Sequence, residues 1–142
     1  MSDVVEFLTA RLDEDEAAAE AHLNEVALAI YNAATAHPRR KPCNDFTTLP
    51  PLVQTRYRAL ALESQPASAR VLAEAKAKRA IVALHQPEEV EYLDGDGQDR
   101  MSTDCTTCDT GGCANTWPCD TLKLLATPYD QHPDYDEAWR PS

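Results

Sequence analysis

Apolar residues recur at helical spacing through the first 36 residues of the chain. Asp3 and Glu6 form a D-x-x-E start of the capping-box type. The apolar series that follows is Val5, Leu8, Leu12, Ala19, Leu23, Val26 and Ile30. The acidic run 13–16 fills a whole helical turn, so it interrupts the apolar stripe on every face. The pattern predicts one long helix, or two shorter helices that meet at the acidic run, ending before Pro38.

Prolines mark the limits of the next elements. Residues 37–51 contain four prolines and the basic triplet 39–41, a composition that cannot sustain a helix and predicts a linker. Pro51 and Pro66 each suit the first turn of a helix. Two helices are therefore expected within residues 52–86, the first running to about Glu63 and the second stopping before Pro87, with His85 in its last turn.

The last third of the chain shows little periodicity. Residues 88–104 are acidic and rich in turn residues, and they predict a flexible loop. A short helix is expected over residues 121–126, ended by Pro128. Together these patterns predict a mainly α fold: a small helical domain, single over residues 1–142, with a zinc-knuckle-like insertion between the last two helices. Residues 87–142 are expected to hold the acidic loop, the cysteine knuckle, the short helix and the aromatic tail.

The formal net charge of −11 limits the classes of partner. Thirteen basic residues against twenty-four acidic ones repel both a nucleic-acid backbone and an anionic membrane surface, so we expect no direct binding to either. The acidity serves solubility, or it forms a docking face for a basic protein or a decoy for DNA. No basic leader and no run of about 18 apolar residues is present, and we expect a cytoplasmic protein.

Four of the five cysteines lie between residues 105 and 119. In a reducing compartment such a cluster favours metal over disulfides. Cys105 and Cys108 have the two-residue gap with which both sulfurs of a tight turn reach one metal. Cys119 precedes the predicted short helix, whose dipole stabilises a thiolate. We therefore predict one structural zinc ion.

Two ligand sets fit these residues. One is local and consists of Cys105, Cys108, Cys113 and Cys119; the other replaces Cys113 by His85 and joins the end of one helix to the start of the next. Ordinary thiols and an iron–sulfur cluster are the alternatives to zinc. The acidic loop also has an Asp-Gly-Asp-Gly sequence, but its spacing places Asp99 where a calcium loop needs glycine.

The C-terminal tail is dense in aromatic residues and prolines. We expect its rings to cover the apolar side of the short helix, and we regard four of them as candidates for contact with a partner: Trp117, Tyr129, Tyr135 and Trp139. The pattern P-C-x-T-L-x-x-L-A-x-P-Y-x-x-H-P-x-Y-x-x-x-W-R-P resembles the ending of a family of small proteins of unknown function from actinobacteria and their phages. Residues 7–16 and 69–85 share the resemblance.

This resemblance implies a ligand set but no activity. A histidine matching His85, a C-x-x-C pair and a proline-cysteine recur in that family, which implies the set of His85, Cys105, Cys108 and Cys119 and makes Cys113 an extra cysteine. The family has no established substrate or partner.

Sequence motifs of catalysis are missing. The chain has no H-E-x-x-H, no G-x-S-x-G, no phosphate-binding glycine loop and no zinc-deaminase signature, so no residue is predicted to be catalytic. The favoured hypothesis is a zinc-stabilised protein-interaction module with a protein partner. An acidic DNA mimic that inhibits a nucleic-acid-binding protein is the second hypothesis, and a small zinc enzyme is the third.

Overall fold

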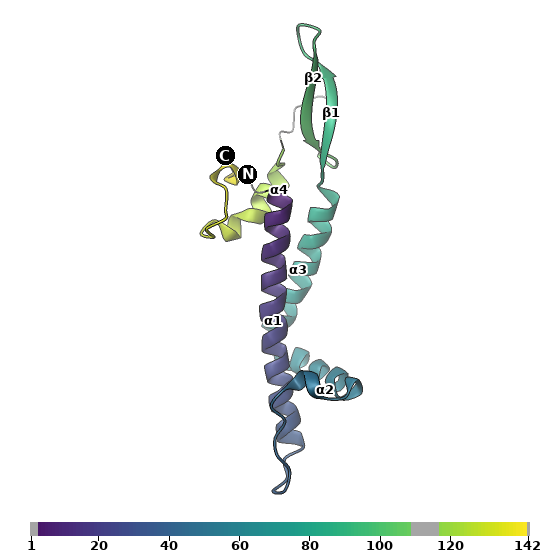
Figure 1. Ribbon diagram of the computed structural model, residues 1–142, viewed down its shortest axis with the longest axis vertical. Coiled ribbons are helices and arrows are strands. Elements are labelled where there is room, and N and C mark those ends of the chain that lie inside the picture. The colour runs from purple at the N-terminus through teal and green to yellow at the C-terminus, as the bar shows by residue number, and fades with distance from the viewer. Residues whose placement is uncertain (1–2, 109–116, 142) are drawn as a thin grey trace. The chain divides into compact units, whose positions relative to one another are not determined.

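The chain is mainly helical, as the sequence predicts. A computed structural model describes residues 3–108 and 117–141 (Figure 1). These residues form four α-helices, one two-stranded sheet and three short 3-10 helices. The chain divides into two compact units, and each is described by itself: Met1–Leu12 with Ala77–Ser142, here the first unit, and Asp13–Lys76, the second unit. The single domain expected from the sequence stays a prediction.

Helix α1 spans Val4–Ala34 without interruption. Of the two alternatives left by the sequence, one long helix is therefore correct. Asp3 caps its start, because its carboxylate accepts a hydrogen bond of 3.0 Å from the backbone N–H of Val5. The acidic run 13–16 remains helical because its side chains are exposed or half-buried and glutamate is a good helix former, so the backbone bonds need no apolar contact there.

The second unit packs around the later part of α1. Helix α2 spans Pro51–Ser64, and helix α3 spans Pro66–Leu84 and crosses from this unit into the first; both agree with the predicted ranges. The linker is irregular, as predicted, except for a 3-10 helix at Phe46–Thr48. The buried residues of this unit's core are Leu23, Ala27, Tyr31, Phe46, Leu49 and Ala61.

Two hydrogen bonds fix the linker of the second unit to α1. The side-chain amide of Asn32 donates to the backbone oxygen of Cys43 at 2.8 Å, and its oxygen accepts from the backbone N–H of Cys43 at 2.9 Å. Because both backbone groups of one residue are satisfied by one side chain, the linker does not need regular secondary structure at this point.

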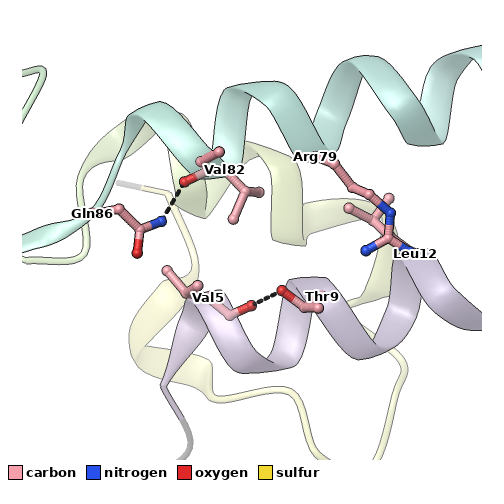
Figure 2. Close-up of a pocket in the computed structure, with 7 residues that line it drawn as sticks. Val5, Thr9, Leu12, Arg79, Val82 and Gln86 are labelled. Atoms are coloured by element: carbon pink, nitrogen blue, oxygen red, sulfur yellow. Dashed lines mark hydrogen bonds between the residues drawn. The ribbon is translucent and has the colours of Figure 1, made fainter.

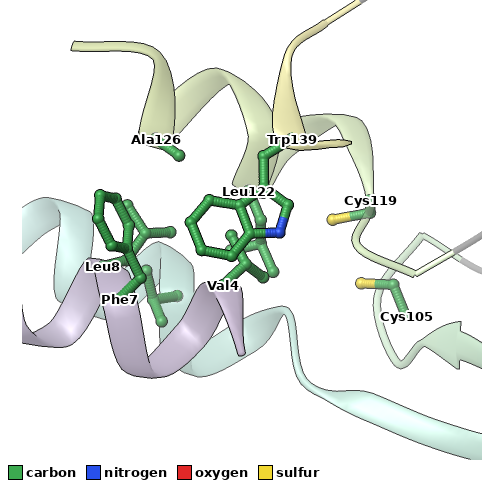
Figure 3. Close-up of a cluster of buried hydrophobic side chains, with 9 residues drawn as sticks. Val4, Phe7, Leu8, Cys105, Cys119, Leu122, Ala126 and Trp139 are labelled. Atoms are coloured by element: carbon green, nitrogen blue, oxygen red, sulfur yellow. The ribbon is translucent and has the colours of Figure 1, made fainter. Parts of the chain in front are cut away.

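The core of the first unit joins both ends of the chain. Helix α4 spans Asp120–Ala126, close to the predicted short helix, and its buried side chains meet the first two turns of α1 (Figure 3). The buried members are Val4, Phe7, Leu8, Val82, Cys105, Cys119, Leu122, Ala126 and Trp139. Two of the cysteines are thus part of the apolar core.

Aromatic residues of the C-terminal tail surround Phe7. Its ring centroid lies 5.0 Å from that of Trp139, 6.0 Å from Tyr135 and 6.2 Å from Tyr129. These distances fall within the range of edge-to-face and tilted aromatic pairs. The tail therefore packs, as expected, and it covers the start of α1 as well as the short helix.

The predicted flexible loop at residues 88–104 is wrong: this segment forms an antiparallel β-hairpin. Strand β1 spans Pro87–Leu93, strand β2 spans Asp99–Cys105, and Val90 pairs with Ser102 at the centre. Neither strand shows the alternation of buried and exposed side chains that reveals a half-buried strand. The hairpin is held by its backbone pairing and its turn. Its strands therefore have no apolar periodicity from which the sequence could predict them.

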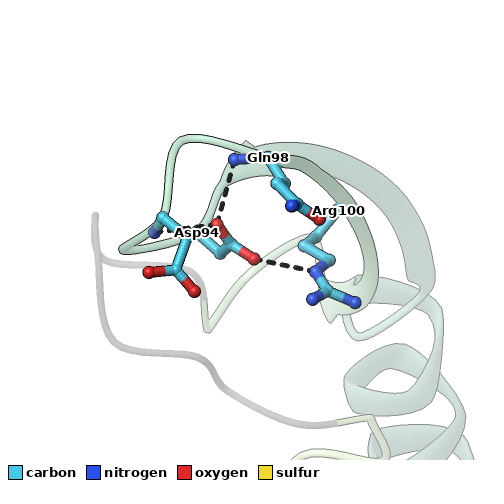
Figure 4. Close-up of polar contacts among 4 residues, drawn as sticks. Asp94, Gln98 and Arg100 are labelled. Carbon is cyan, nitrogen blue, oxygen red and sulfur yellow. Dashed lines mark hydrogen bonds and ion pairs between the residues drawn. The ribbon is translucent and has the colours of Figure 1, made fainter.

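The hairpin turn is ordered by Asp94 (Figure 4). Its carboxylate accepts bonds of 3.0 Å from the backbone N–H of Asp96 and of Gln98, and it pairs with the Arg100 guanidinium at 2.9 Å. These bonds hold the pKa of Asp94 below its ordinary value, and the bond from the backbone N–H of Gln98 has the largest effect. Gly97 has a φ of 75°, a conformation that suits glycine, and it completes the tight turn between Asp94 and Gln98, whose backbones are hydrogen-bonded to each other.

Burial on α4 predicts which of its leucines matters for stability. Leu122 is fully buried, whereas Leu124 on the same short helix is 61% exposed. We expect Leu122→Ala to lower the free energy of unfolding by about 2–5 kcal/mol, because it removes apolar contacts and leaves a cavity. Leu124→Ala is the matched control and should change it by less than about 1 kcal/mol. Urea unfolding followed by circular dichroism measures both, and equal losses would contradict the packing described here.

Candidate metal centre

Four potential metal ligands from three parts of the first unit meet at one point. They are His85, Cys105, Cys108 and Cys119, and one ligand atom of each lies within 4.8 Å of those of the others. His85 directly follows α3, Cys105 is the last residue of β2, and Cys119 is the N-cap of α4. Residues separated by up to 34 positions therefore share one site.

The separations fit a single tetrahedral metal ion. The Nδ1 atom of His85 lies 3.3 Å from the sulfur of Cys105, 3.4 Å from that of Cys108 and 3.5 Å from that of Cys119. Tetrahedral zinc with Zn–S of about 2.3 Å and Zn–N of about 2.0–2.1 Å requires N···S distances of about 3.5 Å. The three N···S distances are thus those that one zinc-sized ion would impose.

The end of α3 is tied to the cysteine turn by hydrogen bonds that the sequence did not reveal. Thr106 and Thr107 both donate their hydroxyls to the backbone oxygen of Leu84, the Thr106 bond at 3.0 Å. The backbone N–H of Thr106 donates to the oxygen of Gln86 at 3.0 Å. The last carbonyls of a helix lack partners within it, so these bonds satisfy the helix end and position His85 beside the turn.

The cluster is buried at the edge of the core. Cys105 is fully buried, Cys119 is 3% exposed and His85 is 9% exposed, while Cys108 is half-buried. In Figure 3 the Cys105 and Cys119 side chains lie beside one another, next to Trp139 and Val4. Polar atoms that are shielded from water in this way need partners, and a single metal ion would be the common partner of all four ligand atoms.

The thiols differ in how easily they lose their protons. Burial raises the pKa of Cys105, but hydrogen bonds from the backbone N–H groups of Thr107 and Cys108, together with those of the Cys119 and Cys108 side chains, outweigh it and hold that pKa below its ordinary value. The pKa of Cys108 is raised to about 11. Burial is the largest cause, and hydrogen bonds with Cys105 and Cys119 and the negative charge of these two residues add to it. The cation of a bound metal would favour all three thiolates.

The structure brings together the mixed ligand set and leaves Cys113 outside the described residues. Cys43, the remaining cysteine, belongs to the second unit, where its thiol donates to the backbone oxygen of Asp45 at 3.2 Å. All four residues of the cluster were among the five candidates of the sequence analysis, and the family resemblance implied this set. The sequence did not reveal that the site is continuous with the apolar core, because core membership depends on residues distant in sequence.

The four aromatic residues considered for partner contact belong to the packing of the first unit. Trp139 is 4% exposed, and the rings of Trp117, Tyr129 and Tyr135 are partly buried against the same core. Their packing is evident, and their predicted role in binding a partner stays a prediction.

A shallow groove of the first unit lies between the start of α1 and the end of α3. Val5, Thr9 and Leu12 line one side, and Arg79, Val82, Ala83 and Gln86 line the other (Figure 2). Its volume is about 230 Å³. Sites for small molecules are typically about 300–1,000 Å³, so this groove is small for a substrate pocket. Among the described residues, no helix is long and apolar enough to cross a membrane.

Fold and site define a mainly helical protein with a buried three-cysteine, one-histidine cluster before its last helix. The profile of a family of unknown function, DUF6221, matches residues 1–141, and the chain belongs to that family. No curated protein and no solved structure matches it. The resemblance to a family of unknown function is thereby confirmed, while the origin in actinobacteria and phages and the C-terminal motif stay predictions.

Proposed function

We propose that this protein is a small module, held together by one structural zinc ion, that binds another protein. The observation that carries the zinc part is the convergence of one imidazole nitrogen and three sulfurs within 4.8 Å. Three cysteines and one histidine form a common donor set of structural zinc sites, in which four protein ligands close the coordination sphere. Such a site leaves no open position for a substrate, which favours a structural role over catalysis.

The spacing of the donors supports one metal ion over a multinuclear cluster. In an iron–sulfur cluster of two or four irons the protein ligands are distributed over different irons, so they do not all lie as close together as the ligands of a single ion. Here His85 Nδ1 lies 3.3–3.5 Å from each of the three sulfurs. Zinc suits a tetrahedral site of soft thiolates and one imidazole.

The binding role is supported by the surface of the first unit. The hairpin carries exposed Tyr92, Leu93 and Met101, with exposed fractions of 49%, 69% and 58%. Leu93 and Met101 lie on one face of the hairpin and Tyr92 lies on the other, so both faces offer an exposed apolar side chain for contact with another protein. The small groove volume gives less support to a substrate-binding enzyme.

Purified under reducing conditions, the protein should contain about one equivalent of zinc and have no visible colour. Removal of the metal should expose residues 85–129 to hydrogen exchange, because structural zinc contributes about 10–16 kcal/mol in small zinc-binding peptides. The core of the second unit contains none of the four ligands and should keep its protection. Elemental analysis and hydrogen exchange with and without a chelator measure these effects; brown protein with bound iron would contradict zinc.

Single substitutions distinguish the two ligand sets. We expect His85→Ala and Cys119→Ser to abolish stoichiometric zinc, because each removes one of four converging donors. Cys113→Ser should retain zinc and stability. Cys43→Ser is the matched control for loss of a thiol, since Cys43 lies in the second unit. Elemental analysis of the four variants decides the matter: loss of zinc in the Cys113 variant with retention in the His85 variant would establish the four-cysteine set.

We expect no measurable binding to random duplex DNA at physiological salt. The net charge of −11 opposes binding to a phosphate backbone, and the basic cluster at residues 39–41 is only three residues long. Fluorescence anisotropy with a labelled duplex is a direct measurement. Micromolar affinity that falls steeply with added salt would show that this expectation is wrong.

A further inference from the structure

The outer edge of β1 presents unpaired backbone groups. The backbone N–H of Asp94 donates to the oxygen of Gln98 at 2.9 Å, which makes these two residues a hydrogen-bonded pair. In an antiparallel ladder hydrogen-bonded and non-hydrogen-bonded pairs alternate. With the observed register, the non-hydrogen-bonded residues of β1 are Leu93, Glu91 and Glu89, whose N–H and C=O groups point away from β2.

A contact on the other strand supports this assignment. Thr103 pairs with Glu89, so its backbone oxygen must also point outward from the hairpin. That oxygen accepts a hydrogen bond of 3.2 Å from the backbone N–H of Trp117. The edge of β2 is thus partly occupied. In the described part of the chain, the outward backbone groups of Glu89, Glu91 and Leu93 have no such partner.

The side chains on this edge have a definite chemistry. Between Pro87 and Cys105 the hairpin carries seven acidic residues and one basic residue, and β1 itself has three glutamates and no basic residue. Glu89, Glu91 and Leu93 lie on one face of β1, and Glu88, Val90 and Tyr92 lie on the other. Apart from the half-buried Val90, all of these side chains are exposed.

We propose that the outer edge of β1 binds an extended, basic segment of a partner protein as a third strand. This inference rests on the protein-binding function proposed above and names its surface and the chemistry of the partner. Strand addition uses the free backbone groups of the edge for affinity and the flanking side chains for specificity. A two-stranded hairpin is only marginally stable in water, so a third strand also stabilises it.

The charge of the glutamates on β1 favours a different protein over a second copy of this chain as the added strand. If β1 of one molecule paired with β1 of another, the glutamates of the two strands would lie beside each other, and like charges in adjacent strands are destabilising. Charged side chains on an edge prevent self-association in this way. The same carboxylates favour a strand with lysine or arginine beside Glu89 and Glu91, and with threonine or an aliphatic residue beside Val90 and Tyr92.

The test uses the full-length protein with its metal and a peptide of defined sequence. The probe is a fluorescently labelled ten-residue peptide, blocked at both ends, in which lysine alternates with threonine. We expect saturable binding at peptide concentrations up to about 1 mM, weakened by salt, and protection of the Glu89, Glu91 and Leu93 amides from hydrogen exchange. The same peptide with glutamate for lysine should not bind. N-methylation of alternate backbone amides should abolish binding when it blocks the groups that face β1.

Two protein variants separate backbone pairing from charge. Glu91→Pro removes an outward N–H but no hydrogen bond of the β1–β2 ladder, and it should raise Kd at least about tenfold. Glu89→Gln with Glu91→Gln should raise Kd and flatten its salt dependence. The matched control removes two exposed charges from helices of the second unit, Glu25→Gln with Glu63→Gln, and should bind like the unchanged protein.

The outcomes for the zinc site and for the edge are distinct. Zinc content and unfolding are measured on every variant, and a protein without metal would contradict the proposed function whatever the peptide does. A metal-loaded protein that fails to bind the lysine peptide, or that binds it equally with Glu91→Pro, overturns the strand-addition proposal alone. Protection of these amides by self-association, detected by sedimentation without peptide, would also overturn it.

Discussion

The organisation of the first unit depends on the meeting of His85 with three cysteine sulfurs at the edge of the apolar core. Cys105 and Cys119 are buried members of the same cluster as Leu8, Leu122 and Trp139. The position of α4 beside α1 is therefore linked to the position of the donor atoms, and a change at either affects both. In a chain with only two Phe and two Trp, such a link adds stability where apolar area is scarce.

The two compact units use different means to hold irregular backbone. In the second unit the side chain of Asn32 satisfies both backbone groups of Cys43, and the linker needs nothing further at that residue. In the first unit the threonine hydroxyls of the cysteine turn satisfy the last carbonyl of α3. Both devices give partners to backbone groups that have none within a regular helix or strand, and the second one also aligns metal-binding donors.

The acidic hairpin contrasts with the buried donor cluster beside it. Its side chains contribute little to a core, since none from Pro87 to Asp104 is fully buried. The turn, with Asp94 and Gly97 at defined positions, orders the two strands although their side chains are exposed. The hairpin is therefore an element of the surface and not of the core. This surface is where charge and unpaired backbone coincide, and a partner of opposite charge is its natural complement.

The sequence by itself predicted the helices after residue 50 and the three cysteines of the candidate site. The ranges of α2, α3 and α4 follow from prolines and local apolar spacing, and Cys105, Cys108 and Cys119 follow from their own spacing, because these signals act over a few residues. The resemblance to a family, rather than geometry, favoured His85. Tertiary structure decided the rest: the hairpin, whose polar strands lack periodicity, and the burial of the cysteines among residues from both ends of the chain. The burial depends on residues far apart in sequence, which no local pattern encodes. The hairpin is local, but its signal lies in the turn with Asp94 and Gly97 and not in apolar periodicity.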